Sequence, residues 1–292
     1  MRSSRWIGLS MAVVVLSWGL NYVVTKIGVS HLAPVNFVFW RFLATAVLCV
    51  PWMVRSWPRT WRAVGGLVIM GLVGVSLYQW LFTTALHLTL SANVAFLFTL
   101  SPLLTLLWQR IRGKDRPGSH VWWGALVSFA GVGFLAGASV EGGFAGDLVA
   151  FLAAASWSAF ALVTEHFKVR VRGLAQTGWI SLVGAIGMVP FVHLGPVWQM
   201  GFGTWGPLLY TILFVTMLGL SFWQGAVERV GAGRASLALY GIPLVAAVAG
   251  WVFLGESLSL LQGVGAVAIV VGVALADGRF RRRMPPAAPE VA

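Results

Sequence analysis

Residues 241–257 read GIPLVAAVAGWVFLGES, an apolar run that contains a proline and ends on Gly255 and Glu256. Pro243 has no backbone N–H to donate to the carbonyl of Leu239, so it interrupts the helical hydrogen bonding. Inside a bilayer, a carbonyl freed in this way is tolerated only where it faces protein or a wet cavity. The stretch therefore indicates a membrane-spanning helix with a kink at Pro243. That kink either faces a cavity or packs against a neighbour for shape alone.

The composition of the whole chain fits this interpretation. The 292 residues are 59% hydrophobic and 10% charged, with a mean hydropathy of +0.86. A soluble domain carries about 25% charged residues. Apolar runs near 18 residues or longer are typical of transmembrane helices. The sequence contains ten such runs: 7–29, 35–54, 63–86, 91–109, 120–138, 147–167, 174–194, 206–228, 232–254 and 259–277.

Basic residues are concentrated at the two termini and in every second connection between these runs. Of the 20 Lys and Arg residues, 18 fall on one side: Arg2, Arg5, Arg55, Arg59, Arg62, Arg110, Arg112, Lys114, Arg116, Lys168, Arg170, Arg172, Arg229, Arg234, Arg279, Arg281, Arg282 and Arg283. The loops of the other side carry Glu141, Asp147 and Glu256. Positive charge stays on the cytoplasmic side, so we expect a multi-pass protein of the cell (inner, plasma) membrane with both termini cytoplasmic. Residues 279–292 read as a basic, disordered cytoplasmic tail.

The chain matches itself at two similar offsets. Residues 85–115 align with 226–256 at a shift of 141, which pairs Pro102 with Pro243. At a shift of 139, SWGLNYVVTK (17–26) aligns with SWSAFALVTE (156–165). These matches predict two five-helix repeats, 1–140 and 141–278. Five is an odd number, so the second repeat is inverted in the membrane, as in many transporters. The fold class predicted is an all-α integral membrane protein of ten transmembrane helices, with Pro102 and Pro243 as hinges.

The same motifs resemble a known family. SWGLNYVVTK, FWRF, ALHLTLSANVAFLFTLSPLLTLL and AVERVGAGRASLALYGIPLVAAVAGWVFLGESL are similar to the EamA-type, ten-helix exporters of the drug/metabolite transporter superfamily. The resemblance covers nearly the whole chain, although Lys114-Asp115 stands in the first half where Gly-Glu is usual. Within the superfamily the chain looks most similar to the aromatic amino acid exporters. The resemblance implies export of small metabolites.

Helix midpoints place a set of polar and aromatic side chains at similar depth. The candidate substrate-binding residues are Trp18, Asn21, Tyr78, Gln79, Phe82, Thr99, Ser101, Trp157 and Tyr240. Polar side chains at the centre of a bilayer face the protein interior, and Trp18 and Trp157 are repeat mates. We therefore expect a cavity wall, with helix packing as the alternative for any single aromatic residue. Glu256, at a helix end, reads as an anchor and not as a proton carrier.

The substrate class follows from which charges are missing near the centre. Helix 7–29 has no acidic residue, and 147–167 has none near its middle, so an organic cation has no counter-charge. Lys26 and Arg41 are the basic candidates, and Arg41 lies about two turns into its helix, near enough to reach the outer surface. A neutral or zwitterionic solute, such as an amino acid with an aromatic or other apolar side chain, fits best. Its carboxylate would meet Asn21 or Gln79.

Other functions were weighed against transport. The five His residues show no HxxxH or HExxH spacing, and the sequence contains no Walker A loop. We therefore expect the protein not to be an enzyme and to bind no metal and no cofactor. Because the basic residues follow the membrane topology, we also expect no nucleic-acid partner. Without a central ionisable group, the mechanism expected is alternating access by a facilitator that follows the substrate gradient. A proton-coupled drug/metabolite (multidrug) exporter and a passive channel remain alternatives. The partners expected are a small-molecule substrate and the lipid bilayer, with the protein a monomer or homodimer.

Overall fold

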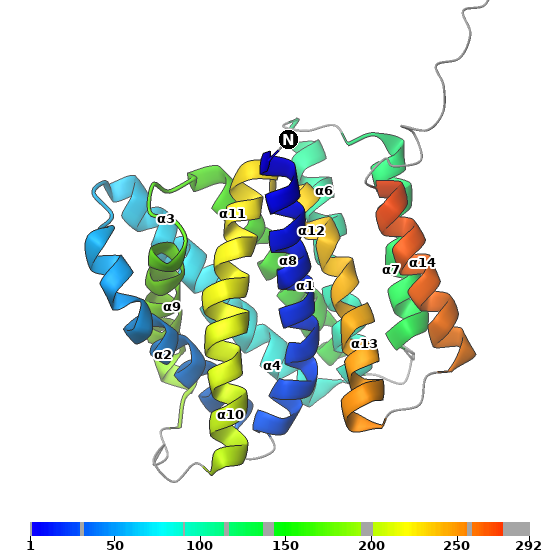
Figure 1. Cartoon of the computed structure of the whole chain (residues 1–292), viewed down its shortest axis with the longest axis horizontal. Coiled ribbons are helices and arrows are strands. Elements are labelled where there is room, and N and C mark those ends of the chain that lie inside the picture. Colours follow the sequence, from blue (N-terminus) through cyan, green and yellow to red (C-terminus); the bar gives the residue numbers. More distant parts are fainter. Residues whose placement is uncertain are drawn as a thin grey trace, which may run out of the picture.

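The computed structural model describes residues 2–29, 32–89, 91–113, 117–136, 143–193, 201–255 and 259–276 (Figure 1). Helices make up nearly all of this part of the chain, and no strand occurs in it. The predicted tail 279–292, the repeat boundary at 140/141, Lys114, Asp115 and Glu256 lie outside the described residues. The helices are α1 (Arg2–Val29), α2 (Pro34–Arg55), α3 (Trp61–Gly71), η1 (Leu72–Leu77), α4 (Tyr78–Leu88), α5 (Ser91–Phe98), α6 (Ser101–Ile111), α7 (Ser119–Ala136), α8 (Phe144–Phe167), α9 (Leu174–Met188), η2 (Val189–Phe191), α10 (Phe202–Tyr210), η4 (Thr211–Leu220), α11 (Ser221–Val230), α12 (Ala232–Leu237), η5 (Ala238–Tyr240), α13 (Gly241–Leu254) and α14 (Leu260–Ala276).

Each of the ten predicted apolar runs coincides with helix in the described residues. By length and composition, eight helices there can cross a membrane: Trp6–Val29, Pro34–Arg55, Trp61–Ala85, Val94–Ile111, Phe144–Phe167, Leu174–Phe191, Gly203–Val230 and Ala232–Phe253. Two shorter apolar helices, Ser119–Leu135 and Leu260–Ala276, occupy the other two runs. The all-helical class predicted from the sequence is thus confirmed, with eight long spans and two shorter helices.

Local sequence signals explain where several helices begin and end. Pro34 opens α2, where a missing N–H costs no helical bond. The Thr60 hydroxyl accepts a hydrogen bond of 3.2 Å from the Ala63 backbone N–H and caps α3. Gly231 and Gly255 end α11 and α13 with φ angles of 88° and 67°, which only glycine adopts without strain.

Several spans are irregular in their middle. The helix 61–88 contains the π-helical segment η1, and the helix 202–230 contains the π-helical segment η4. A shift of 141 residues carries η1 onto positions inside η4. π-Helical turns widen the hydrogen-bond ladder and are frequent at functional sites. The irregularities therefore fall at equivalent places in the two halves of the chain.

The helices form one bundle with two distinct ends (Figure 1). At one end α7 packs side by side with α14, and at the other α2 packs against α9, which also contacts α3. Between them, α1 packs against α10, η4, α11 and α13, while α8 packs against α4, α5 and α6. The largest buried apolar cluster includes Trp157, Phe160 and Trp223 of this central region and extends into α2, α3 and α9.

Glycines bring the backbones of α7 and α14 into close contact. A Cβ at Gly131 would lie 2.7 Å from the Gly265 carbonyl oxygen, and one at Gly272 would lie 2.6 Å from that of Gly124. Between these contacts, the Ser128 hydroxyl donates to the Ile269 carbonyl oxygen at 3.4 Å. The two helices are therefore antiparallel at this interface. Gly124 and Gly265, Gly131 and Gly272, and Ser128 and Ile269 are each separated by 141 residues.

Candidate functional site

Pro102 and Pro243 each follow a tightened turn in the middle of a span. α5 stops at Phe98, and the backbone N–H groups of Thr99 and Leu100 bond three residues back, at 3.0 Å each, before α6 begins. In the other half, the 3₁₀ turn η5 separates α12 from α13, and Pro243 lies in the first turn of α13. A proline in the first turn of a helix sacrifices no helical hydrogen bond. Each proline therefore lies at the start of a helical segment, where it displaces no helical hydrogen bond.

A pocket lies between these two turns. Its lining is Tyr22 of α1, together with Phe98, Thr99, Ser101, Pro102, Leu239, Tyr240, Ile242 and Pro243. The last eight residues form four pairs at an offset of 141, so the two halves contribute equivalent positions. Its free volume of about 10 Å³ holds roughly one water molecule. An amino acid enters this space only if the two bent spans move apart.

Polar atoms in this pocket lack partners. The Ser101 hydroxyl and the Tyr240 hydroxyl are buried, and neither has a hydrogen-bond partner among the described residues. The Thr99 hydroxyl is already used, since it donates to the Phe96 carbonyl oxygen at 2.6 Å. A buried polar group without a partner costs about 1–3 kcal/mol, and native structures contain few of them. Ser101 and Tyr240, two lining residues of the pocket, thus keep unused hydrogen-bonding capacity.

An aromatic cluster adjoins the pocket, with Trp157 of α8 at its centre. The centroid of the Trp157 ring lies 5.0 Å from that of Trp223, 5.1 Å from Tyr78, 5.3 Å from Phe160, 5.4 Å from Trp18 and 6.0 Å from Phe98. These are the distances at which offset and edge-to-face ring pairs attract each other. Phe98 belongs to both the pocket lining and the cluster. The cluster therefore meets the pocket lining at Phe98.

The indole N–H groups of this cluster differ in whether they have a hydrogen-bond partner. Trp18 Nε1 donates to the carbonyl oxygen of Val215, 3.0 Å away in the π-helical η4. The indole N–H groups of Trp157 and Trp223 are buried without a partner among the described residues. Trp18 and Trp157, paired in the sequence at an offset of 139, meet edge to face with an interplanar angle of 77°. The two residues predicted to line a cavity wall are thus in direct contact with each other.

The structure divides the sequence-predicted residues into three groups. Thr99, Ser101, Tyr240, Pro102 and Pro243 line the pocket, and Trp18, Tyr78 and Trp157 lie in the aromatic cluster. The Phe82 ring is tilted by 34° against that of Tyr78, with centroids 5.8 Å apart. Asn21 and Gln79 belong to neither feature. The Asn21 side-chain oxygen accepts a 3.0 Å hydrogen bond from Thr25, and Gln79 is buried in α4.

Sequence reasoning missed Tyr22, Phe98 and Trp223. Tyr22 follows Trp18 by four residues and so shares its helix face, a signal that was present in the sequence. Phe98 and Leu239 each stand four residues before a proline, at the carbonyl that the proline cannot bond. Trp223 carries no comparable signal. It lies near the end of its apolar run, and linear counting puts it away from the centre.

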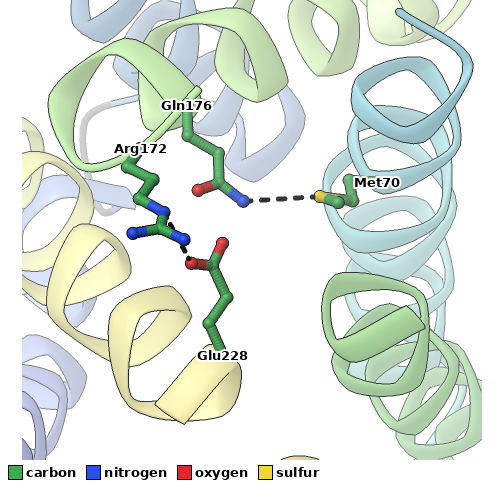
Figure 2. A network of polar contacts seen from close by, with 4 residues as sticks. All are labelled: Met70, Arg172, Gln176 and Glu228. Atoms are coloured by element: carbon green, nitrogen blue, oxygen red, sulfur yellow. Dashed lines mark hydrogen bonds and ion pairs between the residues drawn. The ribbon is translucent and has the colours of Figure 1, made fainter. Parts of the chain in front are cut away.

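Two carboxylates, Glu165 and Glu228, connect different helices near the ends of α8 and α11. The Glu165 side chain accepts hydrogen bonds from the Gln109 amide at 2.8 Å and from the Ala232 backbone N–H at 3.1 Å, so it links α8 with α6 and α12. Glu228 lies 3.6 Å from Arg172 Nε (Figure 2). Both acids lie near helix ends, at a distance along the chain from the pocket residues.

The amide of Gln176 completes the Glu228 network. Figure 2 draws its nitrogen toward the Met70 sulfur, 3.7 Å away. With the amide turned over, the nitrogen donates to Glu228 Oε1 and to the Val171 carbonyl oxygen, both at 3.2 Å. We assign the turned orientation, because two oxygens are better acceptors than one thioether sulfur. The network then ties α11 to the start of α9.

The chain is similar to known proteins over most of its length. The EamA-like transporter family matches the chain twice, over residues 5–137 and 144–276. The "Uncharacterized transporter YyaM" of Bacillus subtilis is 26% identical over 90% of this chain and 90% of its own length. The "Probable amino-acid metabolite efflux pump" of Salmonella typhimurium is 26% identical over 96% of this chain and 97% of its own. A protein of known crystal structure shares the fold, with a TM-score of 0.78 at 22% identity over 96% of this chain and 99% of that one.

The apolar helices and the family matches lead to the same result. The described part of the chain holds eight helices able to cross a membrane, and similar proteins of nearly equal length are named as transporters. This is a multi-pass membrane protein, and the resemblance inferred from its sequence motifs is confirmed. The chain belongs to the EamA-like transporter family.

Proposed function

We propose that this protein exports small neutral or zwitterionic metabolites, among them amino acids with aromatic or other apolar side chains. The observation that carries the proposal is the pocket between the two proline turns, with free hydroxyls at Ser101 and Tyr240 and an aromatic wall beside it. Polar groups beside an aromatic surface suit a solute with a polar backbone and an apolar side chain. The relative from Salmonella, named a probable amino-acid metabolite efflux pump, supports the same substrate class.

The proposed mechanism is alternating access between two inverted five-helix repeats. The paired lining of the pocket and the antiparallel contact of α7 with α14 are what two halves related by a pseudo-two-fold axis would produce. In this proposal ten helices span the inner membrane and both termini are cytoplasmic, following the one-sided distribution of basic residues. The narrow pocket corresponds to a closed intermediate, and Pro102 and Pro243 are the points at which it opens toward either side.

We further propose that transport is facilitated diffusion. The described carboxylates, Asp147, Glu165 and Glu228, stand near helix ends, whereas proton-coupled carriers place an ionisable group along the substrate path. The Glu165 bridge favours the alternative, a proton-coupled exporter, because this carboxyl group links three helices through its hydrogen bonds to Gln109 and Ala232. The two mechanisms differ in whether a pH gradient alone moves substrate.

The first prediction tests this difference. Purified protein in liposomes is given labelled L-phenylalanine at equal concentration on both sides and an imposed pH gradient. A facilitator produces no net accumulation, but it does give saturable counterflow when unlabelled phenylalanine is added on one side. Protein-free liposomes are the control. Uphill accumulation that a protonophore abolishes refutes facilitation, and flux that stays linear with concentration indicates a channel.

A further inference from the structure

Arg41 lies deep in the membrane-spanning part of the bundle. Its Nε donates a 2.6 Å hydrogen bond to the hydroxyl of Thr216, which lies midway along the span Gly203–Val230. The neighbouring carbonyl of Val215 accepts the indole N–H of Trp18, itself midway along Trp6–Val29. The Arg41 guanidinium is therefore at the depth of the aromatic cluster. The expectation that this side chain reaches the outer surface is wrong, because η4 holds it inside.

This arginine has no counter-charge in the described part of the chain. Of the carboxylates there, Asp147 accepts a hydrogen bond from Thr89, Glu165 bonds Gln109 and Ala232, and Glu228 pairs with Arg172. The contacts of the Arg41 guanidinium within the described residues are the Nε–Thr216 bond and the ring of Phe42, whose centroid lies 5.0 Å from Cζ. An arginine inside a membrane protein faces the bundle interior or a wet cavity and is costly unless an anion or water meets it.

The free side of this guanidinium is close to the candidate site. α2 packs against both α4 and η4. Tyr78 of α4 belongs to the aromatic cluster, as does Trp18. Tyr22 lines the pocket, and Tyr78 contacts Phe98, another lining residue, with ring centroids 5.5 Å apart. Through Thr216, Arg41 is thus held next to Val215, the η4 residue whose carbonyl accepts the hydrogen bond from Trp18 of the aromatic cluster.

We propose that the Arg41 guanidinium binds the carboxylate of the transported solute, while the Trp157-centred cluster receives its apolar side chain. Thr216 occupies Nε, which leaves the four N–H donors of the two terminal nitrogens, and their planar fork matches a carboxylate. The proposal rests on the proposed function and sharpens it: the substrates are carboxylates, zwitterionic amino acids included. It replaces Asn21 and Gln79, which neither line the pocket nor join the cluster, as the carboxylate-binding groups.

The test compares acids with their amides on the detergent-purified full-length chain. The probes are L-phenylalanine against L-phenylalaninamide, and 3-phenylpropanoate against 3-phenylpropanamide, with binding measured from ligand-induced thermal stabilisation. In the wild type we expect each acid to bind at least about tenfold more tightly than its amide, as charge-assisted hydrogen bonds imply. Arg41→Gln should reduce this ratio to about one. Arg41→Lys, which keeps the charge without the fork, should give an intermediate ratio.

The matched control is Arg55→Gln, at the exposed end of the same helix, which should leave the acid-to-amide ratio unchanged. If Arg41→Gln is not recovered as folded protein, the Lys variant decides, and an unchanged ratio overturns the proposal. Equal binding of acids and amides by the wild type, or no binding of either acid, also overturns it. Saturable transport of the amides would leave the export proposal standing without the carboxylate role. Acid-selective binding without transport of any amino acid would refute export alone.

Discussion

At the scale of one residue, the Tyr240 hydroxyl lacks, among the described residues, the hydrogen-bond partner that a buried hydroxyl in a protein core normally has. It is fully buried beside Pro243. Tyr240→Phe should therefore raise the melting temperature, because it removes a desolvated polar atom, and should lower phenylalanine flux in liposomes. The matched control is Tyr210→Phe, whose hydroxyl donates to the Ser17 carbonyl oxygen at 3.2 Å. That variant should melt lower. A fall in the melting temperature of Tyr240→Phe would contradict the assignment.

Individual residues also show how far the sequence predicts the candidate site. The repeat offset identified Pro102 and Pro243, and helix midpoints identified Tyr240; all three line the pocket. Trp223 was not predictable, since its place beside Trp157 depends on how η4 and α11 run through the bundle. Arg41 was placed by counting turns from a helix end, which ignores the hydrogen bond to Thr216 that draws it inward. Depth along a helix is encoded locally, whereas the direction of a side chain depends on its neighbours.

At the scale of elements, the contact of α7 with α14 depends on the absence of side chains. Gly131→Ala should lower the melting temperature, because the new methyl group would lie 2.7 Å from the Gly265 carbonyl oxygen and 2.8 Å from the Ile269 nitrogen, both backbone atoms. Gly263→Ala, in α14 with open space at its Cβ, is the matched control and should be neutral or slightly stabilising. Scanning fluorimetry of the two purified variants makes the comparison. Equal melting temperatures would mean that the two helices are free to separate.

The helices themselves were largely predictable, and their irregularities were not. Apolar runs located all ten helical segments, because a backbone in hydrocarbon must satisfy its own hydrogen bonds. Nothing in LVGVSL (72–77) or TILFVTMLGL (211–220) favours a π-helix over an α-helix. In η4, the Thr216 hydroxyl bonds the Thr211 carbonyl oxygen at 3.0 Å, while the Val215 carbonyl accepts the bond from Trp18. The widened turn is thus stabilised partly by a partner on another helix, which local sequence does not record.

At the scale of the whole molecule, the distribution of charge makes a topological prediction. In a Cys49→Ala background, Arg112→Cys should be protected from a membrane-impermeant thiol reagent in intact cells, and Phe144→Cys should react. Both positions are well exposed, Phe144 to 83%, so burial does not limit the reaction. Permeabilised cells are the control, in which both variants should react. Labelling of Arg112→Cys from outside would reverse the proposed orientation of every span.

The hydrogen bonds of Glu165 affect the relative populations of the two access states in the proposed mechanism. If both halves carried identical sequences, the states open to either side would be related by a two-fold rotation and would have equal free energy. In the proposed repeat the sequence position equivalent to Glu165, at an offset of 139, is Lys26, and an ammonium group cannot accept hydrogen bonds such as those that Glu165 accepts from Gln109 and Ala232. Each 1.4 kcal/mol that they contribute shifts the ratio of the two states by about tenfold. In the proposed mechanism, one carboxylate thus sets which side of the membrane the empty carrier faces at rest.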